Sequence, residues 1–270
     1  MYLADDRRAL SYRQSVVQSR SPQVACIFGR RSVVALRTVE YLEQEGYQVR
    51  TLTISSDAVQ RVKQISPALI ILEAETISRQ AALDLCRAIR RVPSLNWTPI
   101  VLLSPHTSED ERVLGLESGA DEYITESSSG TEVAARVRAV MRRFMRYEVH
   151  PGAFSKDNPS LQYSWSAPNT RIIAGDIEID PTAMTIAVRG TPVETTNLEF
   201  RLLYYLLHHQ GRVFTRDELL NAVWGAEFVE LRSVDACIRR LRRKIEPEPY
   251  SPTYLKTVRG AGYCFQRSVA

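Results

Sequence analysis

The feature that most constrains the fold is a regular alternation of short apolar runs and helical patterns over residues 24–144. The apolar runs are VACIF (24–28), VRTLTI (49–54), ALIIL (68–72), PIVLL (99–103) and DEYIT (121–125). Segments of helical periodicity, such as QAALDLCRAIRR and TEVAARVRAVMRRF, lie between and after them. Apolar strands that alternate with helices predict a parallel sheet covered on both faces. We therefore predict an α/β fold of five strands and five helices.

The composition changes along the chain in a way that divides it into four parts. Residues 1–22 are polar, contain several arginines and lack periodicity, which predicts a flexible N-terminal extension. Residues 23–146 carry the alternating pattern, and residues 147–170 are rich in Pro, Ser and Asn, which is typical of a linker. Residues 171–270 form a second domain, for which a chain of 270 residues has room.

Several classes of protein are disfavoured by what the sequence lacks. No apolar run approaches the ~18 residues of a membrane span, and the N-terminus lacks the apolar core of a secretory signal, so we expect a cytoplasmic protein without a membrane partner. The cysteines show no CxxC spacing, and the histidines lie near neither a nucleophile nor a metal-ligand spacing. We predict no catalytic residue, metal or cofactor, and a non-enzymatic protein. The cysteines are Cys26, Cys86, Cys237 and Cys264, and the histidines are His106, His150, His208 and His209.

The second domain opens with short alternating strands and continues with helices. The strands IIAGDIEID, TIAVRG and TPVETT predict an antiparallel ribbon. Two T-x-x-E capping boxes, Thr196 with Glu199 and Thr215 with Glu218, predict two helix N-termini. A third helix is expected over 231–245, followed by a β-hairpin that turns at residues 260–262.

The third helix has one apolar face and one basic face. At ~100° per residue, Val234, Ile238, Leu241 and Ile245 share one side, and Ala236 and most of the arginines share the other. Residues 232–244 contain six basic residues and one acidic residue, whereas residues 21–146 are nearly neutral, with 16 basic and 15 acidic. A face of one charge sign requires a polyanion to relieve its repulsion, and arginine pairs bidentately with phosphate and with guanine. We therefore predict that this helix binds DNA.

The second domain resembles the effector domain of OmpR/PhoB-type response regulators over about residues 171–266. The resemblance rests on EFRLLYYLLHHQGRVFTRDELLNAVWG, RSVDACIRRLRRKIEP and TVRGAGYCF, in this order. It implies a winged helix-turn-helix of α+β type whose third helix enters the major groove of double-stranded DNA, while the loop 225–231 corresponds to one that contacts RNA polymerase in some members. The residues implied to contact DNA are Trp224, Arg232, Ser233, Arg239, Arg240, Arg242 and Arg243, with Thr257, Arg259, Gly260 and Tyr263 in the wing.

The first domain is similar to the receiver of the same family over about residues 23–146, which implies a flavodoxin-like (βα)5 fold. Its frame matches in YLEQEGYQV, TPIVLLSP and DERVLGLESGADEYIT, but its active-site positions do not. A receiver binds Mg²⁺ through two acidic residues after the first strand. Gly29 and Arg30 stand there, or Phe28 and Gly29 if the register shifts by one residue.

The other phosphorylation positions of the receiver are also altered. Glu73 replaces the phosphoryl-accepting aspartate and Glu126 replaces the lysine, whereas Ser104 and Tyr123 retain the switch hydroxyl and the switch aromatic. Without a metal to neutralise the transferring group, Glu73 is a poor acceptor. The resemblance therefore implies a degenerate receiver that acts without phosphorylation. Glu73 has three interpretations: an ion pair with Arg30, mimicry of a phosphoaspartate, or a carboxylate of no consequence.

Dimerisation is the function that such a receiver retains. In the family, the fourth helix, fifth strand and fifth helix form a symmetric face crossed by ion pairs, and suitable charges are Arg112 with Glu132, Glu122 with Arg136, and Asp121 with Arg143. We predict a homodimeric, sequence-specific transcription regulator that binds paired or tandem half-sites. The alternative is a regulator whose altered receiver pocket is gated by a small molecule or a protein partner.

Overall fold

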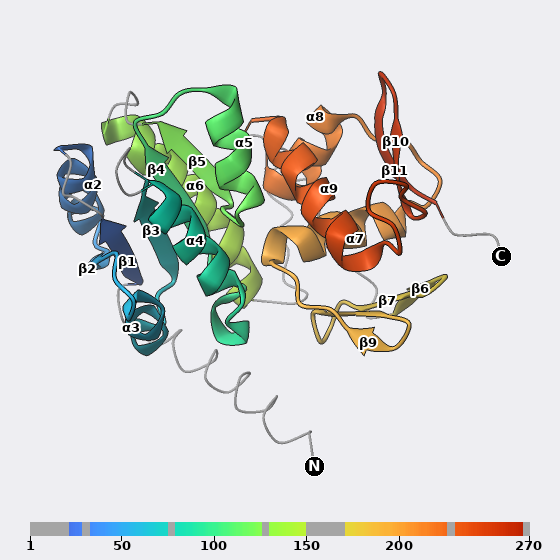
Figure 1. The fold of residues 1–270 in the computed structure, drawn as a ribbon, viewed down its shortest axis with the longest axis horizontal. Coiled ribbons are helices and arrows are strands. Elements are labelled where there is room, and N and C mark those ends of the chain that lie inside the picture. The colour runs from blue at the N-terminus through green and yellow to red at the C-terminus, as the bar shows by residue number, and fades with distance from the viewer. Residues whose placement is uncertain are drawn as a thin grey trace, which may run out of the picture.

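The computed structural model describes residues 22–28, 33–74, 79–125, 130–149, 171–225 and 230–266. The predicted N-terminal extension lies outside the described residues except for Pro22. The predicted linker also lies outside them except for residues 147–149, which continue the preceding helix. Figure 1 shows two units side by side, an α/β unit in blue to green and a mainly helical unit in yellow to red.

A parallel five-stranded sheet forms the centre of the first unit, as the alternating apolar runs predict. Its strand order is β2-β1-β3-β4-β5, which is the flavodoxin-like order of a receiver domain. The three central strands are buried on both faces, which explains their almost wholly apolar sequences. The strands are β1 (Gln23–Phe28), β2 (Gln48–Thr53), β3 (Leu69–Glu73), β4 (Ile100–Ser104) and β5 (Glu122–Thr125).

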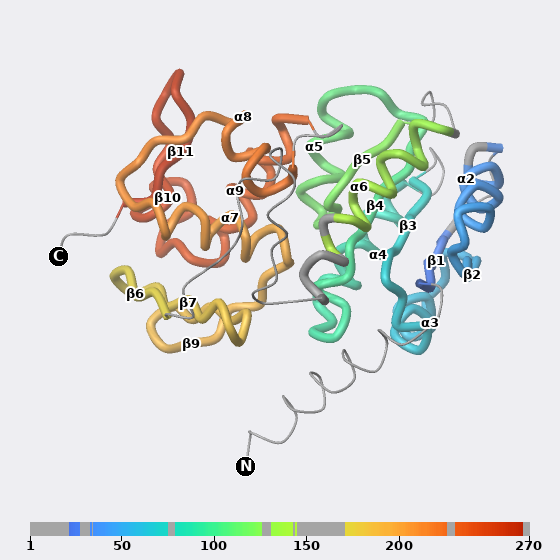
Figure 2. The backbone as a smooth tube through the Cα atoms, turned by 180° about the vertical axis from the view of Figure 1, so that it is seen from behind, coloured from blue at the N-terminus to red at the C-terminus, as the bar shows by residue number. Residues whose placement is uncertain are grey.

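Helices cover both faces of this sheet, and each face has its own apolar core (Figure 2). Two helices, α2 (Val33–Gln44) and α6 (Gly130–Val149), pack on one face. Three others pack on the opposite face: α3 (Ala58–Ile65), α4 (Arg79–Arg90) and α5 (Glu109–Glu117). A short 3₁₀ turn, η1 (Pro93–Leu95), follows α4. None of the described helices is long and apolar enough to cross a membrane.

The second unit is a winged-helix domain that begins with a four-stranded antiparallel sheet. Its strands, in the order β6-β7-β8-β9, are β6 (Ile172–Ala174), β7 (Ile177–Asp180), β8 (Thr185–Val188) and β9 (Thr191–Pro192). The helical layer contains α7 (Asn197–His208), α8 (Arg216–Leu219), a π-helical turn η3 (Leu220–Trp224) and α9 (Arg232–Ile245). The hairpin of β10 (Leu255–Val258) and β11 (Gly262–Phe265) forms the wing at the end away from the first unit (Figure 1).

Both predicted capping boxes are present and fix where the helices begin. The Thr196 side chain accepts from the Glu199 amide, and the Glu199 carboxylate accepts from the Thr196 amide; Thr215 and Glu218 repeat this exchange. Each box satisfies two backbone donors that a helix N-terminus leaves without partners. One difference from the sequence-based expectation is that the second helix ends in a π-helical turn, which stops at Gly225 with φ 78°.

Gly262 sets how closely the wing approaches the body of its domain. Phe214 and Tyr263 form an isolated antiparallel bridge, with 2.8 and 2.9 Å between their backbone N and O atoms. A Cβ at Gly262 would lie 1.9 Å from the Phe214 carbonyl oxygen, and the backbone there has φ 143°. Because the obstructing atoms belong to the backbone, no side-chain movement relieves the overlap.

We expect Gly262→Ala to lower the free energy of unfolding by about 3 kcal/mol or more, since it adds a backbone overlap to an unfavourable φ. The matched control is Gly190→Ala, where φ is 75° but nothing lies within 4 Å of the added Cβ; it should lose only about 1 kcal/mol. Urea denaturation of both variants measures the difference. Equal losses would contradict a specific role for the close approach at Gly262.

Candidate nucleic-acid interface

The apolar face of α9 holds this helix in the domain core, as the helical periodicity predicts. Val234, Ile238, Leu241 and Ile245 are at most 1% exposed and pack with α7 and η3. The basic face is thereby directed away from the core of its own domain.

Two arginines connect the helices to the wing rather than extending into solvent. Arg242 donates to the Leu255 carbonyl at 3.0 Å through Nε and to the Thr257 hydroxyl at 2.7 Å through Nη2. Arg216 pairs with Asp235 at 2.7 Å, and the Tyr263 hydroxyl donates to the same carboxylate at 2.6 Å. Burial, followed by this hydrogen bond, raises the pKa of Tyr263 to about 12. The wing is therefore fixed to α9 through side chains at both of its strands.

The other predicted DNA-contacting residues differ widely in exposure. Trp224 is 2% exposed within the core, and its Nε1 has no hydrogen-bond acceptor among the described residues. Ser233 and Tyr263 are also buried, whereas Thr257, Arg259 and Gly260 are exposed along the wing. Their contact with DNA stays a prediction.

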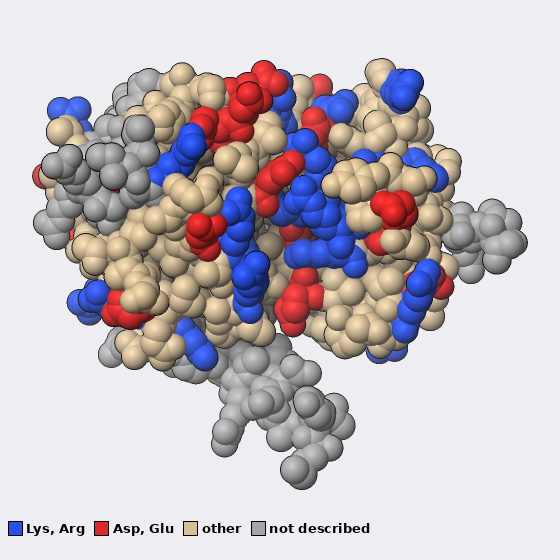
Figure 3. Space-filling view, in the orientation of Figure 1, with Lys and Arg blue, Asp and Glu red and all other residues tan. Residues whose placement is uncertain are grey.

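The exposed arginines of α9 face α5 of the receiver domain and pair with its carboxylates. Arg232 forms an ion pair with Glu109. Arg239 and Arg243 both reach Glu117, at 2.7 and 3.4 Å. Figure 3 shows Lys and Arg side chains gathered at the junction of the two domains, with Asp and Glu side chains beside them. The two domains therefore meet through opposite charges.

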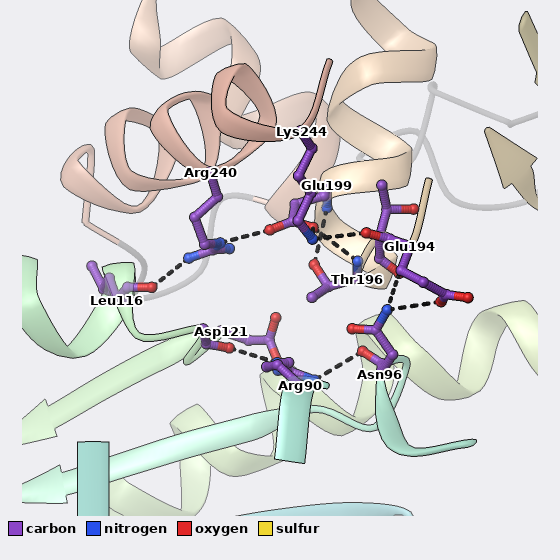
Figure 4. Close-up of polar contacts among 11 residues, drawn as sticks. Arg90, Asn96, Leu116, Asp121, Glu194, Thr196, Glu199, Arg240 and Lys244 are labelled. Carbon is purple, nitrogen blue, oxygen red and sulfur yellow. Dashed lines mark hydrogen bonds and ion pairs between the residues drawn. The ribbon is translucent and has the colours of Figure 1, made fainter. Parts of the chain in front are cut away.

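Arg240 lies deeper, where α9 meets both α7 and α5 (Figure 4). Its Nε donates to the Glu199 carboxylate at 2.7 Å, and its Nη1 donates to the Leu116 carbonyl at the end of α5. Lys244 pairs with the same carboxylate at 2.7 Å. Burial alone would raise the pKa of Glu199, but the two cations and the hydrogen bonds from Lys244 and the Thr196 amide outweigh it and lower the pKa to about 2.

A second group of polar contacts continues the junction along the receiver. The Asn96 amide donates to the Thr195 carbonyl at 3.1 Å and to the Glu194 carboxylate at 3.3 Å. Arg90 donates to the Asn96 carbonyl at 2.9 Å and pairs with Asp121 at 2.6 Å. The adjacent Trp97 packs its ring 5.7 Å from that of Phe200 in α7.

The described part of the receiver pocket contains one carboxylate and two hydroxyls from the predicted set, those of Glu73, Ser104 and Tyr123. Glu73 is fully buried at the end of β3. The Ser104 hydroxyl donates to the Ala74 carbonyl at 3.1 Å and accepts from the His106 amide at 3.2 Å. The Tyr123 hydroxyl donates to the His106 carbonyl at 3.1 Å. Gly29, Arg30 and Glu126 lie outside the described residues, so the Glu73–Arg30 pair stays a prediction.

These residues do not fit the Mg²⁺ ion that receivers of this fold employ. The ion requires near-octahedral oxygen coordination. Glu73 is the one carboxylate that the described strand ends supply, and the Ser104 hydroxyl is already committed to backbone groups. The described residues also contain no cluster of three His, Cys, Asp or Glu side chains arranged for a metal.

The charged residues of the predicted dimer face have partners within the chain. Arg112 pairs with Glu230, which precedes α9. Arg136 pairs with Glu122 at 3.3 Å and with Glu132 at 2.9 Å, and Asp121 pairs with Arg90. The side chain of Arg143 lies outside the description. A dimer through this face stays a prediction.

Sequence reasoning missed the receiver residues that contact α9. Glu109, next to Asp110 and Glu111, has the pattern of acidic residues that favour any helix N-terminus, and Ser108 caps that helix. Glu117 is a single charge that follows the apolar stretch Leu114–Leu116 and belongs to no recurring charge pattern. A sequence signal for their role would require the spatial relation of the two domains, which helical periodicity does not supply.

Comparisons with known proteins agree with this architecture. Residues 31–138 match the family model "Response regulator receiver domain", and residues 190–265 match "Transcriptional regulatory protein, C terminal". A receiver followed by a winged-helix DNA-binding domain defines a response regulator that binds DNA. With both domains in this order, the chain belongs to the OmpR/PhoB-type response regulators.

Solved structures extend the comparison to both domains at once. A RitR mutant is 23% identical over 92% of this chain and 100% of its own, with a TM-score of 0.66, which supports the two-domain fold. DrrB of Thermotoga maritima, an OmpR/PhoB homologue, is 26% identical over 91% and 99% of the two chains, with a TM-score of 0.40. The DNA-binding domain of Klebsiella pneumoniae RstA, solved with the RstA box, is 34% identical over 37% and 99%, with a TM-score of 0.35.

The depressed pKa of Glu199 makes stability depend on pH. A carboxylate whose pKa is lower in the folded chain stabilises it above the unfolded pKa, and this contribution is lost as the pH falls towards the folded pKa. We expect the free energy of unfolding to decrease from about pH 4.5 to about pH 2. Glu199→Gln should flatten this decrease and cost about 3 kcal/mol at neutral pH, since it leaves Arg240 buried without its counter-charge.

Urea denaturation across this pH range tests the expectation, with Glu248→Gln, an exposed glutamate on the loop after α9, as the control. A parallel pH dependence in Glu199→Gln and the native chain would contradict the role given to Glu199.

Proposed function

We propose that this protein is a sequence-specific transcription regulator whose α9 reads the major groove of DNA. The observation that carries the proposal is the basic face of α9. Arg232, Arg239 and Arg243 remain 42–54% exposed at the side-chain level despite their pairs with α5. Guanidinium groups in one row on a helix suit phosphates and guanine edges. The wing, fixed to α9 by Arg242 and Tyr263, would bring Thr257, Arg259 and Gly260 to the adjacent backbone.

The receiver is proposed to act without phosphorylation. Gly29, Arg30 and Glu126 replace the metal ligands and the lysine, and Glu73 replaces the acceptor aspartate. A phosphoryl transfer that lacks both the metal and the cation has no means to neutralise its developing charge. Ser104 and Tyr123 are held by backbone groups, which supports a receiver conformation that is independent of a phosphoryl group.

Dimerisation through α5, β5 and α6 is proposed to pair two winged helices on two half-sites. The sequence assigns Arg112, Asp121, Glu122, Glu132, Arg136 and Arg143 to this symmetric face, and a dimer would have to exchange the pairs that these charges form within the chain. Exposed ion pairs contribute only about 0–1 kcal/mol each, so they would set the register rather than the affinity. We assign the protein to the cytoplasm, where it would meet DNA, and propose that the loop 225–231 is available to RNA polymerase.

We expect Arg239→Ala and Arg259→Ala each to weaken binding to a genomic DNA fragment identified by footprinting by about tenfold. Each should also reduce the slope of log affinity against log salt concentration by about one, the value for one phosphate contact. Arg171→Ala is the matched control, because Arg171 is an exposed arginine that pairs with Glu178 in the four-stranded sheet. Fluorescence anisotropy across a salt series measures both quantities. An equal loss of affinity in all three variants would argue against a specific interface.

We expect acetyl phosphate and beryllofluoride to leave the mass, the oligomeric state and the DNA affinity of the native chain unchanged, since the pocket lacks phosphotransfer groups. Intact-protein mass spectrometry, light scattering and footprinting compare the protein without any phosphodonor and with one.

A strictly monomeric chain without a specific footprint would contradict constitutive dimerisation, and a metabolite-dependent affinity would favour the ligand-gated alternative. Glu73→Gln, with circular dichroism to verify folding, then tests the role of Glu73. An unchanged oligomeric state and DNA affinity would contradict both the ion pair with Arg30 and the mimicry of a phosphoaspartate.

A further inference from the structure

We propose that Asp235 is a positioning residue for DNA recognition, which fixes the direction of the wing relative to α9. The inference rests on the proposed function, because it assumes that α9 and the wing both bind DNA. It adds a role for an acidic side chain that does not touch DNA itself but acts through Tyr263 and Arg216.

Asp235 is the one acidic residue of α9, and its position in the helix is unfavourable for DNA binding. It lies one turn before Arg239, on the side of the helix that carries the exposed arginines. A carboxylate at this position repels the phosphates that the arginines attract. Its place in the first turn of α9 is favourable to the helix dipole. A dipole contribution requires no specific partner, however, whereas the Asp235 carboxylate has two.

The Asp235 carboxylate joins three elements of the winged-helix domain at a single oxygen. Its Oδ1 accepts from Arg216 Nε of α8 at 2.7 Å and from the Tyr263 hydroxyl of β11 at 2.6 Å. Arg216 Nη2 also donates to that hydroxyl at 3.3 Å, and the guanidinium carbon lies 5.1 Å from the centre of the Tyr263 ring. Because Tyr263 is only 5% exposed, its side chain serves this contact rather than the DNA.

A second contact with the same part of the wing fixes its angle as well as its distance from α9. Thr257 and Tyr263 lie opposite one another in the β10–β11 ladder. The Thr257 hydroxyl accepts from Arg242 Nη2 at 2.7 Å, so both residues of this pair are attached to α9. Asp235 and Arg242 are seven residues apart, which is two helical turns or about 10 Å along the helix. Two attachment points at this separation define a direction, whereas one point alone leaves a pivot.

The base of the wing is held independently of Asp235. Glu246, directly after α9, accepts three consecutive backbone amides that lead into β10, at 2.6–3.0 Å. The backbone bridge between Phe214 and Tyr263 holds the other strand. The wing tip with Arg259 lies beyond the pair of residues that α9 anchors. Loss of the Asp235 carboxylate therefore changes the direction of the tip and leaves the fold of the hairpin intact.

The direction of the wing decides whether α9 and the wing tip contact one duplex at the same time. The proposed function assigns α9 to the major groove and the tip to the adjacent backbone, so specific binding requires both contacts at a fixed separation. Binding to mixed-sequence DNA depends mainly on the number of phosphates that are contacted. Asp235 therefore favours the specific site over other DNA, although its own charge opposes binding to either.

Asp235→Ala tests the proposal in the full chain, with Asp217→Ala as the matched control. Asp217 is an exposed aspartate of α8 next to Arg216, so its loss removes the same charge from the same domain and leaves the Tyr263 contact in place. Fluorescence anisotropy measures the dissociation constants of a genomic fragment identified by footprinting and of a mixed-sequence duplex. We expect Asp235→Ala to bind the genomic fragment about tenfold more weakly than Asp217→Ala does, and the mixed-sequence duplex no more weakly.

Two further variants separate positioning from general destabilisation. Arg259→Ala should cost the native chain about tenfold in affinity but the Asp235→Ala chain less than about twofold, because a misdirected tip no longer meets DNA. Tyr263→Phe keeps the ring and removes only the hydroxyl, so it repeats the test in a chain with unchanged packing. It should weaken binding to the genomic fragment about threefold alone and add nothing to Asp235→Ala. Circular dichroism and urea denaturation verify that each variant is folded.

Three results would overturn the positioning role alone: equal affinities in Asp235→Ala and Asp217→Ala, equal losses for both DNA probes, or full additivity with Arg259→Ala. If the native chain prefers no genomic fragment to the mixed-sequence duplex, the proposed function fails, and the inference with it.

Discussion

One buried carboxylate organises much of this molecule. Glu199 accepts the Thr196 amide at 2.9 Å and thereby fixes the start of α7, and it receives Arg240 and Lys244 from α9, each at 2.7 Å. Because Arg240 also reaches the Leu116 carbonyl, the same carboxylate orients the side chain that contacts the receiver. The packing of two helices and the junction of two domains thus depend on a single charge that two cations keep ionised.

The domain junction gives α5 more than one role. Towards the sheet it packs on β5, and Gly115 is required there because a Cβ would lie 2.7 Å from the Tyr123 ring. Towards the winged-helix domain it presents Glu109, Leu116 and Glu117 to α9. Movement of α5 relative to the sheet would therefore change its contacts with α9 directly, without an intervening linker.

Sequence reasoning predicted the elements and missed their assembly. The five strands, both capping boxes and the apolar stripe of α9 follow from local periodicity, and each is confirmed. The helical wheel placed Ala236 and Arg240 on the side opposite the apolar stripe, and both are buried there against the receiver, which the wheel did not predict. Periodicity shows which side of a helix leaves its own core. It carries no information about a second domain that covers that side, or about residues such as Asn96 and Glu117.

The wing remains outside the domain junction, and this has a consequence for the order of events on DNA. Its tip, with Arg259 and Gly260 exposed, projects at the end of the molecule away from the receiver (Figure 1). The wing, which the proposed function assigns to DNA, would therefore be accessible to a duplex while α5 still contacts α9. A duplex bound there would hold its phosphates at a high effective concentration beside the arginine–glutamate pairs, so contact with α9 would become an intramolecular step. Contact with the wing and contact with α9 would then be separate events, made by different parts of the same domain.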